Sequence, residues 1–112
     1  MAHDEKGTLK FDRFTVIPAE RQFIDAERPV RLPPRVFDTL VLLVRNAGKV
    51  LSKDEIMRSV WPDSFVEENN LAQNISLLRR VLGETKDKKF IETVPKFGYR
   101  FLMPRSETAA SV

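Results

Sequence analysis

One segment, residues 69–82, constrains the fold of this chain more than any other. Its large apolar residues recur at a helical spacing and therefore line one stripe of a helix: Leu71, Ile75, Leu78 and Leu82. At about 100° per residue, the opposite side carries Asn69, Gln73, Ser76, Leu77 and Arg80. Amide, hydroxyl and guanidinium groups are donors and acceptors that can read base edges in a major groove. The segment predicts an amphipathic helix with an outward face suited to DNA.

The composition of the chain restricts the class of protein to which this helix can belong. A chain of 112 residues, 42% hydrophobic and 31% charged, is typical of one ordinary globular domain. The absence of cysteine excludes a disulfide framework and a thiolate metal site, and fits a reducing compartment. The apolar run 40–44 is far too short to cross a bilayer, and residues 1–7 are too polar for a signal peptide. The net charge of +3 is compatible with nucleic acid, and basic residues gather over 79–100, which predicts a polarised surface.

Short apolar runs open the chain. Residues 9–17 indicate a hairpin of two strands, and 23–24 and 30–32 indicate two more, separated by a turn over 26–29. The first quarter therefore predicts a small antiparallel sheet. Beyond Pro104 the chain has little to bury, so residues 104–112 are expected to be a flexible tail, and residues 1–7 a disordered start.

Proline and glycine mark the helices. Pro34 fits the first turn of a helix that keeps its apolar period to Ala47, with Gly48 as its C-terminal cap. Residues 49–51 turn the chain. A hydroxyl at Ser52 followed by a carboxylate three residues later forms a capping-box pattern, which predicts a short second helix ending near 61–62.

The start of the third helix is open. A second capping-box pattern begins at Ser64, so either Ser64 or a residue near Glu68 could be the cap, whereas Gly83 closes the helix. Residues 84–89 indicate a charged, mobile connection. Two strand-like arms, 90–94 and 99–102, then surround a four-residue turn.

Three helices followed by a β-hairpin form a winged helix-turn-helix. The chain resembles the OmpR/PhoB-type DNA-binding domain of bacterial regulators, found also in ToxR- and CadC-like proteins. The matching segments are residues 48–56, 60–61, 74–82, 91–94 and 98–101, and the resemblance covers 8–103. It implies an α+β fold: an N-terminal antiparallel β-sheet, three helices and a C-terminal β-hairpin wing.

The resemblance also implies a function and partners. The third helix, 68–82, would enter the major groove of double-stranded DNA, and the wing, 90–102, would reach the minor groove to regulate transcription. The loop 62–68 would contact RNA polymerase. Such domains commonly bind as head-to-tail dimers on direct repeats, and we expect a monomer when free.

The sequence departs from the family pattern in three places. Two arginines that often follow the recognition-helix isoleucine are Ser76 and Leu77 here, so base preference cannot be transferred. The wing has Pro95 and Lys96 where the family often has Arg-Gly, which makes Lys96 the candidate for the minor groove. An acidic residue common early in the first helix is replaced by Val36, interpreted as a packing change.

The expected DNA contacts combine the outward helix face with the family resemblance. Gln73 and Asn74 carry amides that can pair with adenine. Asn69, and either Arg79 or Arg80, stand where phosphate contacts would fix the register. Leu77 could touch a thymine methyl or pack the wing, and Trp61 could be a core anchor or reach a phosphate. The full expected set is Trp61, Asn69, Asn70, Gln73, Asn74, Ser76, Leu77, Arg79, Arg80, Thr93, Lys96, Tyr99 and Arg100.

The remaining candidates are weaker. In the wing, Thr93 and Arg100 are expected at phosphates, and Tyr99 mostly in the core with its hydroxyl outward. Lys86, Lys88 and Lys89 form a charge run that adds at most non-specific attraction. The only histidine, His3, is interpreted as inert, and we expect no metal, no cofactor, no small-molecule substrate and no enzymatic activity.

Two functions from different classes follow. The first is sequence-specific DNA binding with regulation of transcription. The second is a winged helix that contacts RNA polymerase or another partner without specific DNA readout. The DNA-binding part is expected in the cytoplasm. The chain is either a C-terminal fragment or the N-terminal part of a longer ToxR/CadC-like protein. In the second case, which we favour, the sensor, and a membrane anchor if there is one, are expected beyond Val112.

Overall fold

A four-stranded antiparallel sheet opens the fold in the computed structural model, which describes residues 7–102. Its strands, in the order β1-β2-β3-β4, are β1 (Leu9–Phe11), β2 (Phe14–Ile17), β3 (Gln22–Asp25) and β4 (Arg28–Val30), with a 3-10 turn, η1 (Pro18–Glu20), after β2. The predicted sheet is confirmed. The turn before β4 is narrower than expected, because Arg28 and Pro29 already pair with β3. An edge strand tolerates Pro29, which has no N–H to donate.

The first two helices follow their sequence signals closely. Helix α2 (Pro34–Arg45) begins with proline in its first turn, but its cap is Asn46 rather than Gly48. The Asn46 amide donates to the Leu42 carbonyl at 2.8 Å, while the Gly48 N–H bonds to Phe101. Helix α3 (Lys53–Val60) has the predicted capping box between Ser52 and Glu55.

Helix α4 (Glu68–Leu82) is the predicted amphipathic helix. Its four stripe residues, Leu71, Ile75, Leu78 and Leu82, are at most 1% exposed, and Gly83 ends it in the left-handed conformation. The open question of its start is answered at Glu67, the N-cap, whose side chain makes no capping bond. Of the two alternatives, the cap near Glu68 is therefore confirmed, and Ser64 is not the cap.

A second, three-stranded sheet carries the wing. Strands β6 (Ile91–Val94) and β7 (Gly98–Phe101) pair as the expected hairpin, but Val94 pairs with Gly98, so three residues connect them rather than four. The third strand, β5 (Val50–Ser52), was not predicted: residues 49–51 were interpreted as a turn. Leu51 pairs with Tyr99, giving the order β5-β7-β6.

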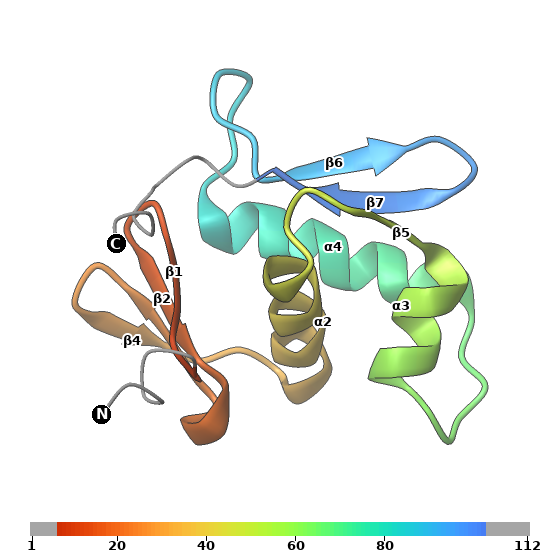
Figure 1. The fold of residues 1–112 in the computed structure, drawn as a ribbon, viewed down its shortest axis with the longest axis horizontal. Helices are drawn as coiled ribbons and strands as arrows, with labels where there is room; N and C mark the ends of the chain where they lie inside the picture. The colour runs from red at the N-terminus through yellow and green to blue at the C-terminus, as the bar shows by residue number, and fades with distance from the viewer. Residues whose placement is uncertain (1–6, 103–112) are drawn as a thin grey trace.

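The arrangement places the hairpin along α4 (Figure 1). The N-terminal sheet lies at one end of the molecule, α2 lies at the centre, and α3 lies at the other end with the loop that leads to α4. Phenylalanines from both sheets meet in one core; the Phe11 and Phe101 rings are 5.0 Å apart, and those of Phe11 and Phe90 5.8 Å. Across residues 7–102, no helix is long and apolar enough to span a membrane. His3, residues 1–6 and the predicted tail lie outside the described residues.

Candidate nucleic-acid interface

The outward face of α4 carries four exposed polar side chains. They are Asn69, Gln73, Ser76 and Arg80, as the helical spacing predicted. Because the apolar stripe on the other side holds the helix against the core, this face is fixed in orientation. Asn70 is exposed as well, but its amide donates to the Glu67 carbonyl at 3.3 Å, at the start of the helix.

Two predicted contact residues point elsewhere. The Asn74 amide donates to the Thr39 hydroxyl at 3.2 Å and to the Arg35 carbonyl at 3.4 Å, so it faces α2 and not solvent. Thr39 is itself fully buried and bonds back to Arg35. Leu77 is half-buried and packs against the core, which favours the packing interpretation over an exposed methyl contact.

Arg79 joins α4 to the wing. Its guanidinium donates to the Ile91 carbonyl at 3.0 Å and to the Thr93 hydroxyl at 2.8 Å. A second contact places its Nε 3.5 Å from a carboxylate oxygen of Glu84. These bonds occupy the guanidinium that was expected at a phosphate, so Arg79 fixes the angle between helix and hairpin.

Glu84 was missed by the sequence reasoning. Its Oε2 accepts hydrogen bonds from the backbone N–H groups of Phe90 and Ile91, both at 2.7 Å, where β6 begins. The residue lies in the segment interpreted as a mobile charged connection, and only its place just after Gly83 could have drawn attention to it. Lys88, in the same segment, pairs with Asp12 at 2.8 Å and lowers the pKa of that carboxyl.

The wing presents its polar groups along the hairpin. Thr93 and Lys96 are exposed, and Lys96 has a φ of 63° in the three-residue loop. Arg100 pairs across the strands with Glu92 at 2.8 Å, and Tyr99 is 9% exposed, mostly core as expected. A shallow groove beside the start of α4 is lined by Lys53, Glu68, Asn69, Leu71, Ala72 and, from the wing, Tyr99.

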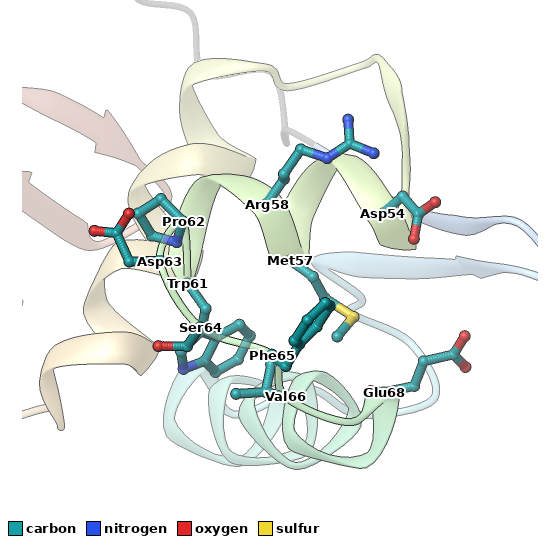
Figure 2. Close-up of a pocket in the computed structure, with 10 residues that line it drawn as sticks. All are labelled: Asp54, Met57, Arg58, Trp61, Pro62, Asp63, Ser64, Phe65, Val66 and Glu68. Atoms are coloured by element: carbon teal, nitrogen blue, oxygen red, sulfur yellow. The ribbon is translucent and has the colours of Figure 1, made fainter.

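Trp61 lies at the end of α3 and borders a separate hollow. Its backbone N–H bonds to Met57 at 2.8 Å, and its side chain is half-buried against the core, which agrees with an anchor. Figure 2 shows the Trp61 and Phe65 rings beside Met57, in a hollow of about 600 Å³ between α3 and the loop before α4. Phe65 itself is fully exposed.

Among the described residues, no group of three or more histidine, cysteine, aspartate or glutamate side chains could hold a metal ion. What the arrangement offers is a polar helix face, a hairpin with cations and a short groove between them. Such a surface can follow a duplex and contact phosphates and base edges.

Sequence comparisons agree with this geometry. The family model described as "Transcriptional regulatory protein, C terminal" matches residues 27–101. Transcriptional regulator HilA of Salmonella typhi is 38% identical over 94 residues, which is 84% of this chain and 17% of that protein. Transcriptional activator CadC of Escherichia coli is 33% identical over 102 residues, 89% of this chain and 20% of that protein. The chain therefore spans a fifth or less of these relatives.

Solved structures show the same fold. The DNA-binding domain of E. coli CadC superposes with a TM-score of 0.76 at 34% identity, covering 88% of this chain and 94% of that one. The Klebsiella pneumoniae RstA DNA-binding domain, solved in complex with the RstA box, gives a TM-score of 0.72 at 26% identity, covering 85% and 96%.

Proposed function

We propose, for a chain that belongs to the OmpR/PhoB-type family of transcriptional regulatory protein C-terminal domains, that α4 enters the major groove of DNA while the wing reaches the neighbouring minor groove. The family makes this a DNA-binding domain of a transcriptional regulator. The observation that carries the proposed geometry is the exposed row of Gln73, Ser76 and Arg80 beside a basic hairpin anchored to the same helix by Arg79.

Each exposed residue then has a distinct role. Gln73 is the candidate for base reading, because its amide can pair with the edge of adenine in two places. Arg80 and Asn69 fix the register on phosphates, and Lys96 neutralises phosphates at the minor groove. Arg79 joins α4 to the wing, and Asn74 contributes a hydrogen bond between α4 and α2.

The test separates base reading from phosphate contact. A preferred duplex is selected from a random pool, and Gln73→Ala, Arg80→Ala and the control Arg45→Ala are titrated against it and against a scrambled duplex at several salt concentrations. Arg45 is an exposed arginine at the far end of α2, outside the proposed interface. We expect Arg80→Ala to weaken both duplexes and to reduce the salt slope by about 0.9, and Gln73→Ala to weaken mainly the selected duplex, by about 1–3 kcal/mol.

Equal losses on both duplexes for Gln73→Ala would remove Gln73 from base reading. If the unmodified protein bound no duplex in preference to another, the second candidate would replace the proposal: a winged helix used only for protein contacts. The fully exposed Phe65 beside the hollow at Trp61 is the observation that supports it.

The loop 62–68 supports a partner contact in either case. We propose that it meets RNA polymerase, because Phe65 presents an apolar ring that none of residues 7–102 covers. Phe65→Ala is expected to leave DNA affinity unchanged and to reduce transcription from a promoter carrying the selected site.

Head-to-tail pairing on direct repeats is tested by binding to one and to two copies of that site. The cysteine-free composition supports a cytoplasmic location, and a membrane anchor beyond Val112 stays a prediction.

A further inference from the structure

An aromatic ring lies at the tip of the wing. Phe97 is 48% exposed, one of three large hydrophobic residues that the described part of the chain leaves in solvent. It follows Pro95 and Lys96 in the three-residue loop between β6 and β7. No role in the fold accounts for it, because the core beneath the hairpin is filled by Tyr99, Phe101 and their neighbours.

The backbone around Phe97 is held on both sides. Its N–H donates to the Val94 carbonyl at 3.0 Å, and its carbonyl accepts from the N–H of Lys53, at the start of α3, at 2.9 Å. The next residue, Gly98, lies so close to the backbone of Leu51 that a Cβ there would collide with it. The ring is therefore presented by a rigid tip, and its exposure does not come from a floppy loop.

We propose that Phe97 is a specificity-determining contact: an apolar wedge that enters the minor groove beside Lys96. The inference rests on the proposed DNA binding and deepens it. Three features favour DNA over a protein surface. Phe97 follows the cation Lys96 in sequence, and the loop at the tip is only three residues long. Lys53, whose N–H donates to the Phe97 carbonyl, also lines the groove at Asn69, which places the tip close to α4. Phenylalanine is among the side chains that insert between base steps from the minor groove.

A wedge reads sequence through shape and not through hydrogen bonds. Pyrimidine–purine steps unstack at the lowest cost in free energy, so the protein should bind most tightly to duplexes that have such a step where the wing contacts the minor groove. The guanine N2 amino group projects into the minor groove and should hinder the ring. The contribution of the neighbouring Lys96 to DNA affinity is electrostatic and depends on salt concentration, whereas the contribution of Phe97 should not depend on it.

The experiment compares Phe97→Ala, Phe97→Leu and Lys96→Ala with the unmodified protein on the selected duplex. The duplex is varied only under the wing: a TA step, a GC step, and the GC step with inosine replacing guanine, which removes the amino group. For the unmodified protein we expect tight binding to TA, weaker binding to GC and recovery with inosine. Phe97→Ala should bind about tenfold more weakly, with little preference among the three and an unchanged salt slope. Phe97→Leu should keep most of the affinity, and Lys96→Ala should lower the salt slope by about 0.9.

Permanganate oxidation of the thymines in the TA step gives a second readout, because permanganate attacks unstacked thymine and the duplex then carries no added minor-groove group. The unmodified protein should raise the reactivity of these thymines by unstacking them, and Phe97→Ala should not. The proposal is overturned if Phe97→Ala keeps both affinity and preference, or if the unmodified protein leaves the thymine reactivity unchanged. These outcomes differ from a failure of the proposed function, in which the unmodified protein would show no preferred duplex at all. Far-UV circular dichroism checks that each variant is folded.

Discussion

Asn74 follows Gln73 directly in the sequence. Because successive residues are about 100° apart around a helix, the Asn74 amide faces α2 whereas the Gln73 amide faces solvent. We predict that Asn74→Ala keeps the base preference of the protein but lowers its free energy of unfolding by about 1 kcal/mol, because the hydrogen bond to Thr39 is lost. Urea denaturation and titration with the selected duplex measure the two quantities. Gln73→Ala is the matched control, and it should change preference with little effect on stability. A changed preference in Asn74→Ala would return Asn74 to base reading.

Glu84 is a single side chain that holds the start of a strand. As a carboxylate it accepts from two backbone N–H groups with one oxygen, and its other oxygen faces Arg79. Glutamine has one amide N–H₂ in place of an oxygen, so Glu84→Gln should set a donor against Arg79 or against those N–H groups. We predict a loss of about 1–3 kcal/mol in the free energy of unfolding. Glu27→Gln, at the exposed β3–β4 turn, is the control and should change it little; equal values for the two variants would contradict the prediction.

Among the helices and strands, those with a local sequence pattern were predictable, including the short strands of the N-terminal sheet and the wing, whereas β5 was not. The stripe from Leu71 to Leu82 and the capping box at Ser52 are local signals, and the structure confirms both. Strand β5 has three residues and exists because Leu51 pairs with Tyr99, far along the chain, a contact that no local pattern reveals. The exposed part of the candidate site followed from helical spacing. Asn74 and Arg79 did not, since their partners belong to α2 and β6.

The ion pair between Asp12 and Lys88 ties the β1–β2 turn to the connection before the wing. The hydrogen bond from Lys88 lowers the pKa of Asp12 below its ordinary value of 3.8. Because the pKa of Asp12 is lower in the folded state, the ionised carboxylate contributes its full stabilisation above pH 3.8. That stabilisation is lost as the pH falls through the folded-state pKa.

We therefore predict that Asp12→Asn lowers the free energy of unfolding at pH 7 by less than about 1 kcal/mol, because the pair is near the surface. Asparagine suits the left-handed backbone at this position, where φ is 53°, so the turn is kept. Denaturation measured from pH 7 down to pH 2 should show the difference between variant and parent shrinking below about pH 4. A difference that stays constant across that range would mean that charge is not its cause.

The N-terminal sheet and the β6–β7 hairpin share one core. Phe11 touches Phe14 from its own sheet and Phe90 and Phe101 from the wing side. A sheet that contributed its own separate core could unfold alone, whereas this one cannot lose its packing without exposing the base of the wing. The molecule should therefore unfold as one cooperative unit.

Phe11→Leu tests this cooperativity with Trp61, the only tryptophan, as a distant probe on α3. We predict a melting temperature lower by about 5 °C, for a loss of about 1 kcal/mol, and the same shift in Trp61 fluorescence and in far-UV circular dichroism. Phe97→Leu is the matched control, since the same change at an exposed ring should leave the melting temperature nearly unchanged. If the circular dichroism transition moved while that of Trp61 stayed in place, the N-terminal sheet would be an independent unit. DNA binding would then depend on the helices and wing alone, whereas a shared shift means that a core defect under β1 reaches the surface proposed to hold the duplex.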